Sequence, residues 1–247
     1  YFPAATEEAT DIYGNGPDGF QAGGLTGMEK AVVAGEGGLF PAVTVPNEPG
    51  MHTIVVQARD YTGTRVIKAA YMKIGVVLKR ETITGDVTST RILTNDTAWD
   101  LSGIVFVKNN ATLFIEPGTF IFGQPGSQPP SALIVTRNGK IVANGTRSRP
   151  IVMTSSRPFG ERTRGDWGGL VILGKAPVNV GANAANNNPS GSFYIEGLAA
   201  TEDGLYGGSD PDHDCGSLRY VRVEYAGSIL SPNNELNSFT FGGCGRL

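Results

Sequence analysis

Short apolar runs separated by polar turns dominate the chain from about residue 81 onward. The runs are rich in Val, Ile, Phe and Thr and are bounded by Gly, Asn or Pro, which is typical of β-strands. No helix-length pattern lies between them. The pattern predicts strands at 103–107, 111–123, 132–135, 140–145, 150–154, 167–174, 193–197, 218–225 and 238–243.

The spacing of these strands predicts a solenoid, in which each coil buries its apolar face on the next. The step from Leu218 to Phe239 matches one coil without insertions, and the longer steps earlier in the chain indicate coils with inserted loops. Segments 175–192 and 198–217, which are rich in Asn, Gly, Ser and Asp, are the longest of these insertions. We therefore expect an all-β solenoid over residues 81–247.

The N-terminal third has a different texture. Its first forty residues are interrupted by Gly throughout and favour loops, whereas 50–60 and 65–74 alternate apolar and polar residues around a turn and predict a hairpin. The pattern Gly-x-His-Thr-Ile-Val-Val-x-Ala-x-Asp from Gly50 resembles the last strands of Ig-like modules of bacterial surface proteins. This resemblance implies a Gly-rich segment plus a small Ig-like β-sandwich module over 1–80.

Four segments of the solenoid region carry a second resemblance: Thr-Leu-Phe-Ile-Glu-Pro-Gly-Thr at 112–119, and the runs at 132–146, 150–155 and 165–174. They are similar to the opening coils of pectin-lyase-like β-helix proteins, in particular bacterial members that are secreted or attached to the cell surface. The resemblance, over about 86–246, implies a right-handed parallel β-helix. It does not imply an activity, because one fold hosts many functions.

Composition and charge exclude some partners. The 247 residues carry a net charge of −3, which argues against a nucleic-acid surface, because phosphate binding needs clustered Lys and Arg. No apolar run approaches the roughly 20 residues of a membrane-spanning helix. The chain begins with Tyr1 instead of Met, which fits a processed chain or a fragment. This start, together with the resemblance to secreted or surface-attached β-helix proteins, implies an extracellular or cell-surface location.

An acidic Gly-rich stretch offers the one candidate metal site. Alternating carboxylates are hard oxygen ligands that could wrap Ca²⁺, although the match to an EF-hand loop is partial and a solvated turn is the alternative. The candidate ligands are Glu202, Asp203, Asp210, Asp212 and Asp214.

Cys215 and Cys244 are the only cysteines and are disulfide candidates outside the cytoplasm. If 218–225 and 236–241 stack in register, the two cysteines fall at opposite ends of the stack. Pairing with each other and pairing elsewhere both stay open.

Catalytic motifs do not emerge from the sequence. It has only two histidines, no nucleophile elbow and no zinc or haem spacing. We therefore expect a non-catalytic structural or adhesive surface protein that self-associates or binds other surface proteins. Its open edge at 238–243, with Phe239 and Phe241, would form filaments or a matrix. The alternative is a polysaccharide lyase-like enzyme or a sugar-binding module, with Trp99, Trp167 and Tyr206 as stacking platforms.

Overall fold

The computed structural model of the chain describes residues 2–4, 50–59, 66–126, 129–158, 160–179, 191–231 and 234–247. The chain divides into two compact units, Tyr1–Val76 and Val77–Leu247. The expected boundary after residue 80 falls inside a strand that belongs to the second unit, Lys79–Thr84.

The described part of the first unit is a three-stranded antiparallel sheet in the order β1-β3-β2. Strands β2 (Gly50–Arg59) and β3 (Val66–Val76) form the predicted hairpin, and β1 (Phe2–Ala4) pairs with the other edge of β3. The remaining strands of the expected Ig-like sandwich, and most of the Gly-rich segment, lie outside the described residues.

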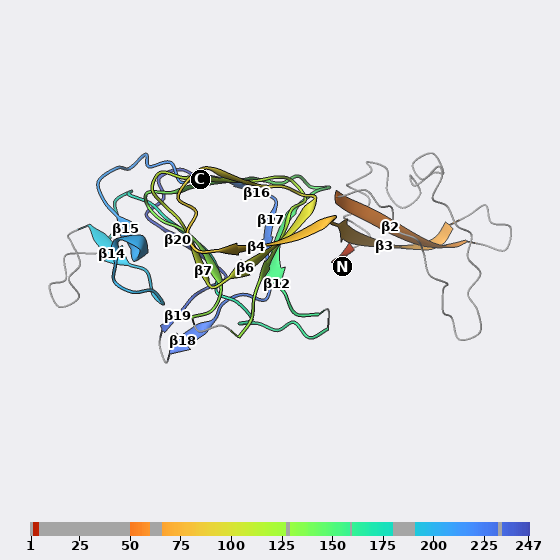
Figure 1. The fold of residues 1–247 in the computed structure, drawn as a ribbon. Helices are drawn as coiled ribbons and strands as arrows, with labels where there is room; N and C mark the ends of the chain where they lie inside the picture. The colour runs from red at the N-terminus through yellow and green to blue at the C-terminus, as the bar shows by residue number, and fades with distance from the viewer. Residues whose placement is uncertain are drawn as a thin grey trace. The chain divides into compact units, whose positions relative to one another are not determined.

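Three parallel sheets make up the body of the second unit (Figure 1). We name them by their position along a coil, as sheets B, C and D. Sheet B contains β4 (Lys79–Thr84), β6 (Thr97–Ser102), β9 (Phe120–Gly123), β12 (Ile151–Ser155) and β17 (Val221–Val223). Sheet C contains β7 (Ile104–Val107), β10 (Ala132–Val135), β13 (Gly169–Leu173) and β20 (Phe239–Gly242). Sheet D contains β5 (Arg91–Leu93), β8 (Thr112–Ile115), β11 (Lys140–Asn144) and β16 (Gly216–Arg219).

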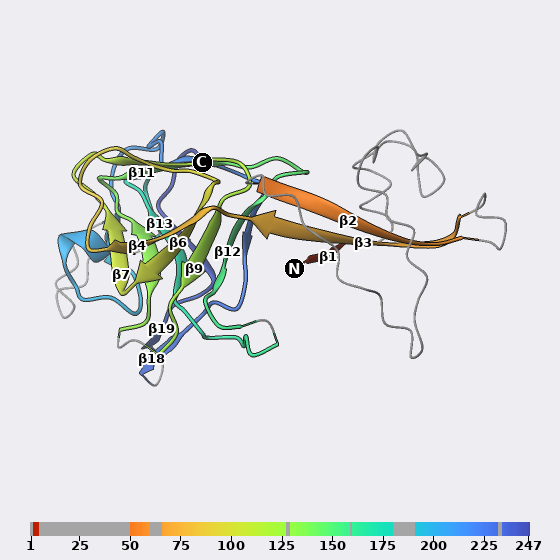
Figure 2. The same cartoon turned by 45° about the vertical axis from the view of Figure 1, so that its right-hand side comes forward.

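From β6 onward the chain visits the sheets in the repeating order B, C, D, so each of these coils adds one strand to each sheet. The first coil passes from β4 to β5 and meets sheet C only at a single bridge between Val87 and Val107. Strands β6, β7 and β8 make one coil, and β9, β10 and β11 make the next, paired in parallel register with the first. Figure 2 shows β6, β9 and β12 side by side in sheet B. The arrangement is a parallel β-helix, as the sequence predicts.

Inward-facing side chains stack in ladders from coil to coil. In sheet C, the register places Val105, Leu133 and Leu170 one above another, and all three are at most 1% exposed. Because strand residues alternate between faces, every second position enters the interior. The interior is therefore a continuous apolar column whose members come from residues far apart in the sequence.

Three of the predicted strands are wrong. The run 111–123 is not one strand, because a turn at residues 117–118 divides it into β8 of sheet D and β9 of sheet B. The run 218–225 is not one strand, because the backbone turns at Tyr220, whose φ is 48°, and divides it into β16 of sheet D and β17 of sheet B. Leu218 and Phe239 therefore lie in different sheets and are not one coil apart. The run 193–197 is not part of a coil: β14 (Ser192–Tyr194) forms a hairpin with β15 (Leu205–Gly207) in the long insertion.

This insertion, which follows β13 and includes the short 3₁₀ turn Glu202–Gly204, covers the outer face of sheet C. Ile195, Leu198 and Tyr206 of the insertion pack against an outer apolar cluster formed by Ala132, Ile134, Val171, Leu173 and Leu236. All residues of β10 and β13 are consequently buried. Sheet D differs, because β8 and β11 alternate between buried and more exposed positions.

A buried carboxylate fixes the corner between β12 and β13. The side chain of Asp166 is 2% exposed and accepts hydrogen bonds from the Arg157 Nε–H and the Thr163 backbone N–H, both at 3.0 Å. Burial raises the pKa of Asp166, but the hydrogen bonds from Ser155, Thr163 and Arg157, with the charge of Arg157, outweigh it and hold the pKa below its ordinary value.

The interior column predicts that stability depends on the direction in which a leucine points. We expect Leu133→Ala to lower the free energy of unfolding by about 2–5 kcal/mol, because it leaves a cavity in the column. Leu78→Ala is the matched control, since Leu78 is 53% exposed, and should cost less than about 0.5 kcal/mol. Urea unfolding followed by circular dichroism measures both. Equal losses would contradict the assignment of Leu133 to the interior.

Asp166 predicts a pH-dependent contribution to stability. Its folded-state pKa is lowered, so its contribution is complete above the ordinary value of 3.8 and is lost as the pH falls through the folded-state pKa. We expect Asp166→Asn to destabilise the protein by about 1–3 kcal/mol at pH 7 and by progressively less below pH 3.8. Urea unfolding between pH 7 and 3, with the exposed Asp212→Asn as control, tests this. If the loss of unfolding free energy in Asp166→Asn stays constant from pH 7 to pH 3, the charge of the Asp166 carboxylate is not its cause.

Candidate functional site

The structure separates the proposed calcium ligands and pairs most of them with cations. Glu202 receives two hydrogen bonds from the Arg137 guanidinium, at 2.8 and 2.9 Å. Asp203 lies 2.9 Å from Lys108 Nζ, which also contacts Asp86 at 2.6 Å. Arg137 and Lys108 belong to the turns between sheets C and D, so these ion pairs connect the insertion to two successive coils.

In the second half of the acidic stretch, Asp214 is paired with a lysine and Asp210 lies near a histidine. Asp214 accepts a 2.7 Å hydrogen bond from Lys140 and a 2.9 Å hydrogen bond from the Gly216 N–H, and these contacts lower its pKa. Asp210 accepts from the Asp212 N–H at 3.2 Å and lies 3.7 Å from His213 Nδ1. Within the part of the chain that the structure describes, no group of three or more potential ligands is placed to hold a metal ion. Calcium binding therefore stays a prediction.

Two of the three proposed sugar-stacking residues lie in the interior. Trp167 is fully buried, its indole packs against Gly123 where any side chain would collide with it, and its Nε1–H donates to the Glu224 carbonyl at 2.8 Å. Trp99 is 5% exposed and donates to the Thr94 carbonyl at 2.9 Å. Neither indole presents a face to solvent, because each fills the apolar column. The expectation of sugar stacking at these two residues is corrected accordingly.

Cys215 and Cys244 form a disulfide bond. Cys215 directly precedes β16 and Cys244 follows β20, so the bond connects the last strands of sheets D and C. The argument that placed the two cysteines at opposite ends of a stack is wrong, because it treated residues of different sheets as one ladder. Disulfides persist mainly outside the reducing cytoplasm.

The inward ladders of sheet C end at two exposed aromatic rings. Phe239 continues the ladder of Leu170, and Phe241 continues that of Ile172. Leu170 and Ile172 are fully buried, but Phe239 is 36% and Phe241 is 52% exposed. The two phenylalanine rings stack with their centroids 5.7 Å apart. They border an apolar hollow of about 310 Å³ lined by Leu218, Tyr220, Val221, Phe239 and Phe241. We call this surface the open end. Its lining residues come from β16, β17 and β20 and from the corner at Tyr220.

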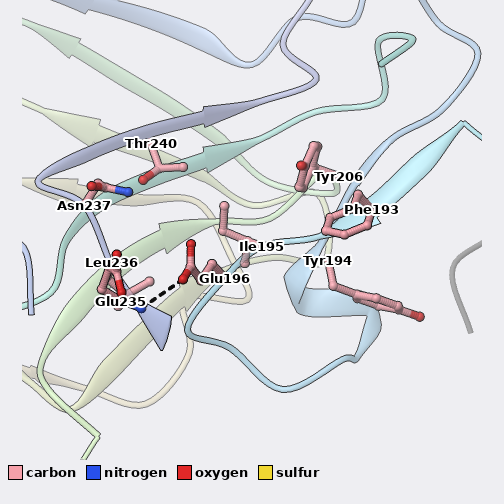
Figure 3. Close-up of a pocket in the computed structure, with 9 residues that line it drawn as sticks. All are labelled: Phe193, Tyr194, Ile195, Glu196, Tyr206, Glu235, Leu236, Asn237 and Thr240. Atoms are coloured by element: carbon pink, nitrogen blue, oxygen red, sulfur yellow. Dashed lines mark hydrogen bonds between the residues drawn. The ribbon is translucent and has the colours of Figure 1, made fainter. Parts of the chain in front are cut away.

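A larger hollow of about 460 Å³ lies on the outer side of sheet C (Figure 3). We call it the outer hollow. The insertion supplies one side of it and the segment leading into β20 supplies the other. Its lining residues are Phe193, Tyr194, Ile195, Glu196, Tyr206, Glu235, Leu236, Asn237 and Thr240. The lining includes β19 (Asn234–Glu235), which pairs with β18 (Ile229–Ser231).

The Tyr206 ring is held from two sides. It packs against Gly242, where a Cβ would come within 2.7 Å of the ring, and it meets the Phe193 ring edge-on at 6.3 Å. On the other side of the outer hollow, the Glu235 N–H donates to the Glu196 carboxylate at 3.3 Å, a bond that ties the insertion to the segment before β20. Tyr206 is thus the one proposed stacking residue that borders a hollow.

Sequence reasoning missed Glu196, Glu235, Asn237 and Thr240. They come from segments that are far apart in the chain, and the packing of the insertion brings them together. One signal was available: Phe239-Thr240-Phe241 alternates, which places Thr240 on the face opposite the two phenylalanines.

Comparison with known proteins agrees with the fold. Residues 85–246 match the family described as the pectate-lyase like beta helix domain, which covers more than half of the chain. The protein therefore belongs to the pectate-lyase-like β-helix family. Searches of curated proteins and of solved structures gave no match. Among the described residues, no helix is long and apolar enough to span a membrane.

The disulfide predicts that the last coil loosens on reduction. The Cys215→Ala/Cys244→Ala double variant should lose about 3–4 kcal/mol of unfolding free energy, the chain-entropy estimate for a cross-link between residues 29 apart. Urea unfolding with and without reductant measures this. Reductant should destabilise the parent protein and leave the double variant unchanged. Equal sensitivity of both proteins to reductant would contradict the bond.

Proposed function

We propose that the protein is a non-catalytic structural subunit of an extracellular or cell-surface assembly, and that it associates through its open end. The observation that carries this proposal is the exposure of Phe239 and Phe241 on ladders that are buried in every earlier coil. An apolar surface of this kind is stabilised by covering it.

The backbone of the same surface supports association. Within the described residues, β16, β17 and β20 each stand at the end of their sheet and have one neighbouring strand. A second chain could add a strand at any of these edges. At the opposite end of sheet B, β4 exposes Lys79, Arg80 and Glu81, and charged side chains of this kind discourage uncontrolled pairing.

Strand β20 exposes aromatic rings and strand β4 exposes charged side chains, a difference that favours a directional contact. Docking of the open end onto the N-terminal region of another copy is heterologous and does not close, so it would build filaments. Docking of two open ends onto each other would stop at a dimer. Filament growth is our proposal, and the disulfide supports an extracellular location because such bonds are rare in the cytoplasm.

Sugar binding is a second candidate function. It is favoured by the outer hollow, where Tyr206 borders polar and acidic side chains. Membership of a pectate-lyase-like family fits an interaction with polysaccharide, although a shared fold does not transfer an activity.

Assembly can be tested with lysine substitutions at the open end. Phe239→Lys or Phe241→Lys should raise the concentration needed for assembly by at least about 30-fold, because burying a charge at an interface costs about 2 kcal/mol or more. Negative-stain microscopy and light scattering of the purified protein provide the measurement. Phe114→Lys is the matched control: Phe114 is 39% exposed in sheet D, away from the open end. Unchanged filaments in both open-end variants would eliminate this interface.

A chelator added in the same experiment tests the calcium prediction. Loss of filaments on chelation, restored by calcium, would implicate the acidic stretch from Glu202 to Asp214. A protein that stays monomeric at every concentration, with or without calcium, would contradict the structural proposal.

A further inference from the structure

We propose that the outer hollow binds a single amino-sugar unit, with the ring against Tyr206 and its ammonium group between Glu196 and Glu235. The inference deepens the second candidate function, sugar binding, and does not depend on assembly at the open end. The proposed ligand class, amino sugars, carries a positive charge.

The first argument is a change of residue type along one outward ladder. The register places Phe106, Ile134, Val171 and Thr240 one above another on the outer face of sheet C. Ile134 and Val171 belong to the outer apolar cluster, and Phe106 packs against it. At β20 the ladder ends in the hydroxyl of Thr240, which lines the outer hollow. Hydrophobic packing therefore ends where a polar cavity begins.

The second argument is the division of the lining into apolar and polar parts. Tyr206, Ile195 and the buried Leu236 supply apolar surface, while Asn237 and Thr240 supply an amide and a hydroxyl (Figure 3). Ligand sites of about 300–1,000 Å³ commonly combine a mostly apolar wall with a few polar groups that fix orientation. A sugar ring has the same division, because its C–H face is apolar and its hydroxyls both donate and accept hydrogen bonds.

The third argument is charge. Among the described residues, the two charged side chains that line the hollow belong to Glu196 and Glu235, which are both acidic and exposed. Two carboxylates attract an ammonium group and repel the carboxylate of a uronic acid. The outer hollow is thus negatively charged, whereas an acidic polysaccharide would need a positively charged site. An amino sugar can place its ring against the apolar wall, its hydroxyls near Asn237 and Thr240, and its ammonium group near the two carboxylates.

The site and the open end use opposite faces of β20. Thr240 points outward to the hollow, whereas Phe239 and Phe241 point into the outline of the coil. Substitutions at one surface should therefore leave the other intact, so assembly at the open end and sugar binding at the outer hollow can be tested independently.

The test compares ligands of one ring size and different charge by isothermal titration calorimetry and by NMR of the labelled protein. Glucosamine should bind in a saturable manner and shift the resonances of residues 193–196, 206 and 235–240. Glucose should bind about five- to tenfold more weakly, and glucuronate more weakly still, because each lacks the attraction of an ammonium to two exposed carboxylates. Cyclohexylamine, which keeps the ring and the amine but lacks hydroxyls, should also bind more weakly than glucosamine.

Variants locate the binding. Glu196→Gln/Glu235→Gln should remove the preference for glucosamine over glucose while leaving glucose binding within about twofold. Tyr206→Ala should weaken both sugars by about tenfold through the loss of the aromatic wall, and Tyr220→Ala, an exposed tyrosine at the open end, is its control. Because Tyr206 also packs on Gly242, the glutamine variants keep the proposal testable if Tyr206→Ala fails to fold.

Three results would overturn the inference: no saturable binding of glucosamine, equal affinity for glucosamine and glucuronate, or cyclohexylamine binding as tightly as glucosamine. An unchanged preference for glucosamine in the double glutamine variant would overturn it as well. Loss of assembly in Phe239→Lys with sugar binding retained would show that the two functions are separate.

Discussion

The whole β-helix depends on parallel pairing between successive coils. A single coil has three short strands of three to six residues, which cannot bury an apolar face by themselves. The ladder from Val105 through Leu133 to Leu170 shows how the next coil supplies the missing cover. Each coil in such a structure is stabilised mainly by its neighbours, and at β20 the rings of Phe239 and Phe241 in the apolar column are partly exposed.

The second constraint is whether the outer face of each sheet is covered. Sheet D leaves its outer face accessible, and Ile92 and Phe114 are exposed there. Sheet C is covered by the insertion after β13, which packs through Ile195, Leu198 and Tyr206 and is joined to the coils by the pairs Lys108–Asp203 and Arg137–Glu202. These ion pairs are partly exposed, so each contributes modestly to stability, but together they set where the insertion lies.

This placement explains both candidate surfaces. The insertion stops short of filling the outer face at β20, which leaves the outer hollow beside Thr240. On the inner face of the same strand, the two phenylalanines border the open end. One four-residue strand, Phe239–Gly242, therefore contributes to two chemically different surfaces, because its side chains alternate between the faces of the sheet.

The sequence by itself determined the secondary structure class, the solenoid and most of its strands, since alternation, β-branched residues and turn residues act over short distances. The predicted strand at 167–174 corresponds to β13, whose residues are all buried. Tertiary structure alone decided the rest. It placed Tyr220 at a corner, joined Cys215 to Cys244, buried Trp99 and Trp167, and drew the acidic residues to separate cations. Each of these depends on which coil pairs with which. That register is set by contacts between residues 18 or more positions apart, which no local pattern encodes.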